Sequence, residues 1–245
     1  MENIKQFLIK IIPSPLLVRL QKNRMEPRYR NLPLKDVFTK IYQEGAWGKG
    51  DGPDQKYFSG SGSHENSITH PYINAVRKML ASYHHKPNVV DLGCGDFHVG
   101  SLIRDLCGVY TACDIVEPLI AYNRDKYEDL DVNFKVLDLT SEIPPDGEVV
   151  FIRQVFQHLS NEQIKQALLN IAGKYKYLVV SEHLPSQPKF AHNLNKPAGS
   201  NTRLSVNSGV VLTSAPFNLK PTESHCLCEV PEQVGVVRTH LYKLA

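Results

Sequence analysis

A short apolar run in the middle of the chain ends in closely spaced glycine and acidic residues. Residues 91–97 read DLGCGDF, so Gly93 and Gly95 stand directly after the apolar residues that precede them. Two glycines at this spacing allow a tight turn in which the backbone comes close to a ligand. A dinucleotide-binding loop would need a third glycine at position 98, where this chain has His98. The sequence therefore predicts a small-molecule site whose glycine loop is not a dinucleotide-binding loop.

Polar residues also follow the next four apolar runs along the chain. Asp114 and Asp138 end the second and third runs, and His158 and His183 follow the fourth and fifth. Carboxylates accept hydrogen bonds from hydroxyl and amino groups, and a histidine titrates near neutrality and can remove a proton from a hydroxyl. These residue types suit binding of a polar ligand together with acid–base chemistry.

The spacing of apolar residues predicts the elements that position these side chains. We expect strands over 88–92, 110–114, 133–137, 148–152 and 177–181, and helices over 69–83, 99–106, 118–127 and 160–171, with two more strands near the C-terminus. Strands that are apolar throughout and alternate with helices are typical of a parallel sheet with helices on both faces. Ligands of such sheets bind beyond the carboxyl ends of the strands, where the residues above are placed.

The run VVDLGCGDF resembles motif I of the class I S-adenosylmethionine-dependent methyltransferases. The resemblance implies an α/β, Rossmann-like methyltransferase fold with a mostly parallel seven-stranded sheet, and S-adenosylmethionine as cofactor. It also implies that Asp114 binds the ribose hydroxyls and that Asp138 faces the adenine amino group. The cofactor contacts expected on this basis are Asp91, Gly93, Cys94, Gly95, Asp114, Ile115, Asp138, Leu139 and Arg153.

Some relatives hold a metal with the sequence E-x-x-E-H after the fourth strand. The corresponding residues here are Gln154 and Gln157, with His158 retained. Neutral amides are poor substitutes for carboxylates on a hard cation. We therefore expect no metal in this site.

Methyl transfer is an in-line displacement, so the protein mainly has to position the acceptor. If the acceptor is a hydroxyl, a nearby base helps to remove its proton. His158 is the first candidate for this base and His183 the second. The alternatives are that His158 packs at the entry to a helix and that His183 makes a contact within a loop.

The segments on either side of the motif region are expected to build the acceptor pocket. Residues 1–66 form an N-terminal extension with a glycine-rich, aromatic lid that contains Trp47 and Tyr57, and a plain linker is the alternative. Residues 67–245 form the cofactor-binding domain, with an insertion at about 183–220. Asn195 and Arg203 in this insertion suit a hydroxyl-rich or anionic acceptor, unless the insertion is only a solvated loop.

Composition limits the partners and the location. Among 245 residues the formal charge is only +3, which argues against a nucleic-acid partner. The five cysteines show no paired framework and indicate reduced thiols in a cytoplasmic protein. Residues 1–24 are apolar and basic, which leaves open a helix that packs on the domain or in a homodimer, and a peripheral anchor on the inner membrane face.

Three functions are compatible with these sequence features. The first is metal-independent O-methylation of a sugar or another small hydroxylated acceptor. A glycan pathway is favoured because the N-terminal segment loosely resembles the starts of proteins of bacterial surface-polysaccharide pathways. The second is N-methylation of a small amine or amino-acid-derived acceptor. The third is a non-catalytic partner subunit with the methyltransferase fold, which would be expected to carry a degraded motif I.

Overall fold

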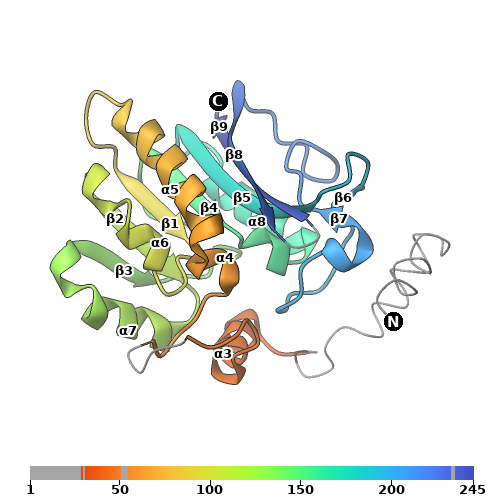
Figure 1. The fold of residues 1–245 in the computed structure, drawn as a ribbon, viewed down its shortest axis with the longest axis horizontal. Helices are drawn as coiled ribbons and strands as arrows, with labels where there is room; N and C mark the ends of the chain where they lie inside the picture. The colour runs from red at the N-terminus through yellow and green to blue at the C-terminus, as the bar shows by residue number, and fades with distance from the viewer. Residues whose placement is uncertain (1–28, 30, 51–54, 233–234) are drawn as a thin grey trace.

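The computed structural model describes residues 29, 31–50, 55–232 and 235–245 of the chain. Seven strands form one sheet in the order β3-β2-β1-β4-β5-β9-β8 (Figure 1). The sheet strands are β1 (Val89–Leu92), β2 (Tyr110–Asp114), β3 (Val132–Val136), β4 (Val149–Arg153), β5 (Tyr177–Pro185), β8 (Glu223–Glu232) and β9 (Gly235–Lys243). The main helices are α3 (Leu34–Glu44), α4 (Ser61–His64), α5 (Asn66–Ala81), α6 (His98–Ser101), α7 (Glu117–Lys126) and α8 (Asn161–Ile171). Strands β6 (Ala191–His192) and β7 (Ser208–Gly209) pair outside this sheet.

The five strands from β1 to β5 run parallel, and β9 runs antiparallel to both β5 and β8. The expected mostly parallel seven-stranded sheet of a Rossmann-like α/β fold is therefore confirmed. Because β1 is central and pairs with β2 and β4, the strand order reverses beside it. The carboxyl ends of these three strands open a crevice at this point, which is where ligands of such folds bind.

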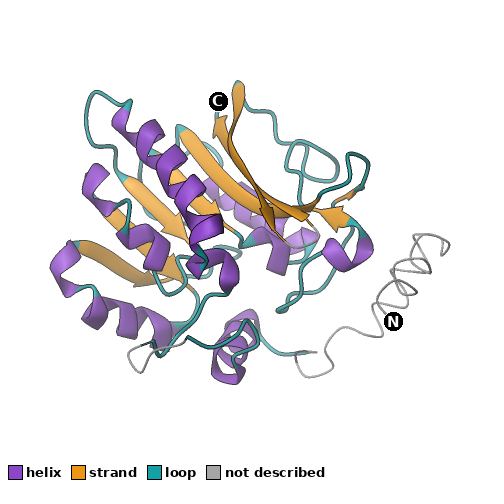
Figure 2. Cartoon of the chain, viewed as in Figure 1, coloured by secondary structure: helices purple, strands orange, loops and turns teal. Residues whose placement is uncertain are grey.

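Helices cover both faces of the sheet, as expected (Figure 2). Successive residues of β1 alternate between the two cores, since Val89 packs with α5 and Val90 packs with α8. Both residues are at most 1% exposed, which explains why the strand is apolar throughout.

Two elements differ from their predicted lengths for physical reasons. The helix predicted over 99–106 is a single α-turn, α6, followed by a 3-10 turn at Arg104–Leu106. In α6 the Ser101 hydroxyl bonds to the His98 carbonyl at 2.7 Å, a local bond that competes with helix continuation. Strand β5 continues to Pro185 because β9 pairs with it along its whole length, which is a long-range partner that local spacing cannot reveal.

Helix α8 begins where the sequence predicts. Ser160 accepts a hydrogen bond from the backbone N–H of Gln163, and the Gln163 side chain accepts one from the backbone N–H of Ser160. This reciprocal capping box satisfies two backbone donors at the start of the helix. It also fixes the point at which the chain leaves the site beyond β4.

Helices α3 and α4 lie at the carboxyl ends of the strands (Figure 1). In α3, Val37, Phe38 and Ile41 are buried against the core, and the helix ends at Gly45 in the left-handed conformation. Helices α3 and α4 belong to the extension predicted over residues 1–66, whose role as a lid is still a prediction. Residues 1–24, for which packing on the domain or a second subunit and a membrane anchor were left open, lie outside the described residues.

No helix in the described part of the chain is long and apolar enough to cross a membrane.

A buried carboxyl lies on β5, next to the site. Glu182 is 3% exposed, its Oε1 accepts from the backbone N–H of Phe156 at 3.1 Å, and its Oε2 has no hydrogen-bond partner among the described residues. Burial raises the pKa of Glu182 to about 8, although the nearby charge of Arg203 opposes this. Folding therefore favours the protonated carboxyl.

This burial predicts a pH-dependent loss of stability that Glu182→Gln removes. The folded state holds the proton more tightly than the unfolded state, so Glu182 lowers stability as pH rises from about 4.5 to about 8. As the pH rises from 5 to 9, the free energy of unfolding of Glu182→Gln should increase by roughly 2–4 kcal/mol relative to that of the wild type. Urea unfolding at both pH values measures this, with the exposed Glu128→Gln as control. An equal response of both variants to pH would show that Glu182 ionises normally.

Candidate functional site

A cavity of about 320 Å³ lies at the carboxyl ends of β1 to β5. Helices α3 and α4 contribute to its lining, as do Ser200, Thr202 and Leu204 of the insertion. All nine residues expected to contact the cofactor line this cavity, as do His158, His183 and Trp47. Its volume falls within the range of small-molecule sites.

The loop after β1 needs both of its glycines. Gly93 and Gly95 have φ of +78° and +57°, in the left-handed region. A Cβ on Gly93 would come within 2.4 Å of a Val155 methyl, and one on Gly95 within 2.5 Å of the Ser59 hydroxyl. The backbone of this loop therefore passes closely between β4 and the lid, and it borders the cavity.

Asp114 at the end of β2 connects this loop to the neighbouring strand. Its Oδ2 accepts from the backbone N–H of Gly95 at 3.1 Å, and its Oδ1 accepts from that of Val116 at 3.0 Å. Burial raises the pKa of Asp114 to about 6, while these backbone donors oppose the rise. Each carboxylate oxygen can accept more than one hydrogen bond, so the group can also receive ligand hydroxyls.

Asp91 of β1 is a second buried carboxyl beside the cavity. It accepts a hydrogen bond from the Tyr110 hydroxyl at 3.1 Å, and burial raises its pKa to about 7. Arg153, at the end of the neighbouring strand β4, also lines the cavity, and its charge opposes this rise. A carboxylate and a guanidinium on one cavity can bind the amino and carboxylate groups of a zwitterionic ligand.

The lining near β2 and β3 is mainly apolar. Ile115 and Leu139 lie there with Asp138, whose Oδ1 accepts from the backbone N–H and the hydroxyl of Thr140 at 2.8 and 2.7 Å. Apolar walls with one carboxylate at their edge suit a flat base that carries an amino group. These residues could hold the adenosine part of the expected cofactor.

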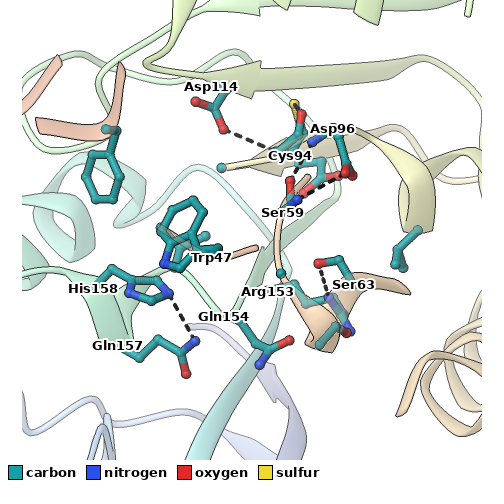
Figure 3. Close-up of a pocket in the computed structure, with 18 of the residues that line it drawn as sticks. Trp47, Ser59, Ser63, Cys94, Asp96, Asp114, Arg153, Gln154, Gln157 and His158 are labelled. Carbon is teal, nitrogen blue, oxygen red and sulfur yellow. Dashed lines mark hydrogen bonds between the residues drawn. The ribbon is translucent and has the colours of Figure 1, made fainter. Parts of the chain in front are cut away.

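Arg153 contacts the lid (Figure 3). Its guanidinium lies 4.9 Å from the centre of the Tyr72 ring and donates to the Ser63 hydroxyl at 3.1 Å and to the Gly62 carbonyl. Its Nε is buried and has no hydrogen-bond partner in the described structure. A ligand in the cavity could therefore supply an acceptor for this side chain.

Both ring nitrogens of His158 already have partners, of which Figure 3 shows Gln157. Nδ1 lies 3.2 Å from the Gly199 carbonyl, and Nε2 lies 3.2 Å from the amide nitrogen of Gln157. A neutral ring that donates from Nδ1 and accepts at Nε2 satisfies both contacts. Burial, with the nearby charge of Lys196, lowers the pKa of His158 to about 3. The structure brings His158 to the site but engages both of its nitrogens, so its expected role as base is still a prediction.

His183 is held by the end of β8. Its Nε2 lies 3.3 Å from the Glu232 carbonyl, and its Nδ1 lies 3.5 Å from the Glu232 carboxylate. The backbone N–H of His183 donates to Oε1 of Gln157, whose amide nitrogen contacts His158. Gln157 thus links the two histidines and uses its own amide for structural contacts.

The lid is fastened to the cavity at two points. At one, the Trp47 indole donates to the Ser200 carbonyl at 3.1 Å, and its ring centre lies 4.9 Å from that of His158. At the other, Asp96 accepts from the backbone N–H of Ser59 at 3.1 Å and contacts His64 Nε2 at 2.6 Å. Trp47 is therefore held against the insertion, while Ser59 and His64 are held against the glycine loop.

Three residues expected to contact the acceptor do not line the cavity. The Tyr57 ring packs at the edges of Tyr42 and Tyr122, and the Asn195 amide oxygen accepts from the backbone N–H of Asn161 at the start of α8. Arg203 is 1% exposed, and its guanidinium makes five hydrogen bonds. Their acceptors are the carbonyls of Leu194, Phe156, Gln157 and Leu159 and the side chain of Asn161. All five donors of Arg203 are therefore used within the protein, where they fasten the insertion to the segment after β4, and none is left for an acceptor in this structure.

Sequence reasoning missed several residues that line the cavity. They include Leu34, Phe38 and Tyr42 of α3, Tyr72 of α5, Thr202 and Leu204 of the insertion, and Glu232 of β8. The helical spacing of Leu34, Phe38 and Tyr42 could have indicated one face of a helix. No local signal marks Glu232, because it reaches the site only through the pairing of β8 with β9.

Within the described residues, no three His, Cys, Asp or Glu side chains come together as a metal site would require. The expectation of a metal-free reaction is still a prediction.

Comparisons with known proteins agree with this geometry. Residues 89–176 match a family model described as a methyltransferase domain. A search of the curated proteins finds no match to the sequence.

Similar solved structures include magnesium protoporphyrin IX methyltransferase (ChlM) from Synechocystis PCC 6803 with bound S-adenosylmethionine. Its TM-score is 0.56 at 13% identity, over 88% of this chain and 99% of that chain. The N-methyltransferase NodS from Bradyrhizobium japonicum WM9, in complex with S-adenosyl-L-homocysteine, has a TM-score of 0.56 at 12% identity, over 83% and 98% of the two chains. These likenesses establish the Rossmann-like methyltransferase fold. Together with the family model they support an S-adenosylmethionine-dependent methyltransferase of class I.

The buried position of Arg203 predicts that Arg203→Lys destabilises the protein. An ammonium has three donors and cannot reproduce five hydrogen bonds, so carbonyl groups at the end of β4 lose their partners. We expect a loss of roughly 2–4 kcal/mol in the free energy of unfolding. Urea unfolding measures it, with Arg238→Lys on the surface of β9 as control. A loss no larger than that of the control would show that the guanidinium contacts contribute little.

The buried Asp114 predicts a pH-dependent affinity for S-adenosylhomocysteine. Hydroxyl donors favour the ionised carboxylate, so binding should tighten as pH rises through about 6, with Asp91 extending the effect toward pH 7. Asp114→Asn should weaken binding at pH 8 by roughly 1–3 kcal/mol and reduce the pH dependence. Calorimetry at pH 5.5 and pH 8 measures both effects, with the exposed Asp125→Asn as control. If Asp114→Asn binds S-adenosylhomocysteine as tightly as the wild type does, Asp114 does not bind the ribose.

Proposed function

We propose that the protein transfers a methyl group from S-adenosylmethionine to a hydroxyl of a small acceptor, without a metal. The observation that carries this proposal is the placement of Asp114, Asp138 and the glycine loop on one cavity at the ends of three adjacent parallel strands. The proposal includes a sugar as the acceptor and a role in glycan biosynthesis.

The acceptor side of the cavity supports a hydroxylated molecule. Its lining contains the hydroxyl residues Ser61, Ser63 and Thr202 and the amide residue Gln154. Hydroxyl and amide groups both donate and accept hydrogen bonds, which matches the donors and acceptors of a polyol. Arg153, the cation of this region, is already engaged by the lid carbonyl and hydroxyl groups described above.

The bound cofactor would supply a sulfonium methyl group with a neutral thioether as leaving group. The residues of this chain then have three tasks. Asp114 and Asp138 bind and orient the adenosine, while Asp91 and Arg153 hold the zwitterionic end. The closed lid, fastened through Trp47, excludes water from the acceptor. Proximity and orientation of two bound reactants supply a large part of the acceleration in such a displacement.

The remaining expectations belong to the same proposal. The proposal includes a cytoplasmic location, which agrees with the unpaired cysteines among the described residues, such as Cys94 and Cys113. It also includes a homodimer or a membrane contact through residues 1–24, which lie outside the described residues.

An acceptor screen tests the proposed reaction. We expect S-adenosylmethionine and S-adenosylhomocysteine, but not NAD, to raise the melting temperature. With labelled S-adenosylmethionine in EDTA, we expect label transfer to at least one of UDP-glucose, GDP-mannose, D-glucose and myo-inositol. A panel of primary amines and amino acids is run in parallel. Transfer to amines alone would establish the N-methyltransferase alternative, and turnover that needs Mg²⁺ would contradict the metal-free reaction.

A further inference from the structure

Glu232, the last residue of β8, lines the cavity on its acceptor side. Its side chain is only 9% exposed, and its Oε1 accepts from the Ser61 hydroxyl of the lid at 3.4 Å. Its Oε2 is buried, lies 3.5 Å from His183 Nδ1 and makes no hydrogen bond within the described part of the chain. A buried carboxylate oxygen without a hydrogen bond is costly, and a ligand that donates one would remove this cost.

Two further side chains meet the same short stretch of the lid as Glu232. Gln154 lies against Gly62, since a Cβ on Gly62 would come within 2.4 Å of Gln154 Oε1. Arg153 donates to Gly62 and Ser63, the residues that follow Ser61. The side chains of Arg153, Gln154 and Glu232 therefore converge on three consecutive residues of α4, although they come from the ends of β4 and β8.

Each of these three side chains has a buried polar atom without a hydrogen-bond partner among the described residues. The atoms are Glu232 Oε2, Gln154 Oε1 and Arg153 Nε, which are two acceptors and one donor. Gln154 is held there with φ of +55°, a conformation that a non-glycine residue adopts at a cost. Neighbouring hydroxyl groups could donate to the two acceptors, while Arg153 is left for the zwitterionic end of the cofactor.

The two histidines of the site are less well placed to receive a proton. Both nitrogens of His158 are engaged by Gly199 and Gln157. Both nitrogens of His183 face Glu232, one its carbonyl and the other its carboxylate. His183 Nδ1 lies 3.5 Å from Glu232 Oε2 and can orient the carboxylate. No hydrogen bond within the described residues occupies that oxygen.

We propose that Glu232 accepts the proton of the acceptor hydroxyl, and that the acceptor carries adjacent hydroxyl groups, as a sugar or a polyol does. This inference rests on the proposed O-methylation. The acceptor oxygen forms its bond to the methyl carbon as the methyl–sulfur bond breaks. The sulfur keeps the electron pair of the broken bond, and the proton of the hydroxyl passes to the Glu232 carboxylate.

A carboxylate is a sufficient base for this step. The hydroxyl becomes strongly acidic as its oxygen bonds to the methyl carbon, so the proton moves to a modest base once transfer is under way. What the step requires is an acceptor of the proton within hydrogen-bond reach. The Ser61 hydroxyl donates to Oε1, which leaves Oε2 for the acceptor hydroxyl.

Glu232→Gln tests the proposal because it keeps the shape of the side chain and removes its basicity. With the hydroxyl acceptor that the wild type methylates best among UDP-glucose, GDP-mannose, D-glucose and myo-inositol, we expect kcat to fall by about 10²–10⁴-fold. Affinity for S-adenosylhomocysteine, and affinity of the loaded protein for that acceptor, should change less than about threefold by calorimetry, since an amide still accepts a hydrogen bond. Glu232→Asp, which keeps a carboxylate, should retain more turnover than Glu232→Gln. Glu229→Gln, an exposed residue of the same strand, is the matched control and should behave as the wild type.

The possible results separate this inference from the proposed function. If the wild type binds S-adenosylmethionine but methylates none of the four hydroxyl compounds, the proposed function fails and the inference falls with it. If the wild type methylates one of them and folded Glu232→Gln keeps near-normal kcat, only the inference fails. A rise in KM at unchanged kcat would also overturn it, because Glu232 would then bind the acceptor without taking its proton. If Glu232→Gln does not fold, equal losses in Glu232→Asp and in a Glu232→Ala variant would contradict a role for the carboxylate.

Discussion

The hydrogen bond between Asp114 and the backbone N–H of Gly95 is the constraint on which the site depends. It joins the end of β2 to the turn after β1, so the glycine loop folds back over the strand ends and does not continue away from the sheet. The carbonyl of Gly95 accepts from the Asn123 amide at 2.7 Å, which fastens the same turn to α7. One buried carboxylate therefore shapes the loop, lines the cavity and provides the group to which a ribose would bind.

The lid depends on the same turn. Asp96, the residue after Gly95, accepts from the backbone of Ser59 and contacts His64, while the Ser59 hydroxyl accepts from the Asp96 backbone N–H at 2.8 Å. The His64 ring stacks between Phe58 and His98, with ring centres 4.6 and 4.7 Å away. His98 is the residue that stands where a dinucleotide loop has its third glycine. His98, which argues against a dinucleotide-binding loop, thus packs against His64 of the lid. In the same lid, Ser61 contacts Glu232.

Local sequence predicted the part of the fold in which neighbouring residues decide the structure. The strand and helix from β1 to α8 were found within a few residues, because apolar runs, glycine turns and the Ser160 capping box act locally. The nine residues predicted to bind the cofactor line the cavity for the same reason, since each lies at or just after the end of a strand.

Of the four residues predicted to contact the acceptor, Trp47 lines the cavity and Tyr57, Asn195 and Arg203 do not. Arg203 lies in a polar stretch of sequence, and the residues next to it in the chain do not indicate that its guanidinium makes five buried hydrogen bonds. Glu232 reaches the site through the pairing of β8 with β9, which is decided by tertiary structure. The histidines were located correctly, but their hydrogen-bond partners, which limit their chemistry, come from Gly199 and Glu232, far along the chain.

The central claim is that one cavity binds the cofactor across the ends of β1, β2 and β3 and leaves the region of Gln154 and Glu232 to the acceptor. A crystal structure of the complex with S-adenosylhomocysteine tests this claim most directly. We predict ribose hydroxyls on the Asp114 carboxylate, adenine between Ile115 and Leu139 with its amino group toward Asp138, and the sulfur turned toward Gln154. A ligand whose adenosine lies on the Glu232 side, or outside this cavity, would contradict the assignment of both halves of the site.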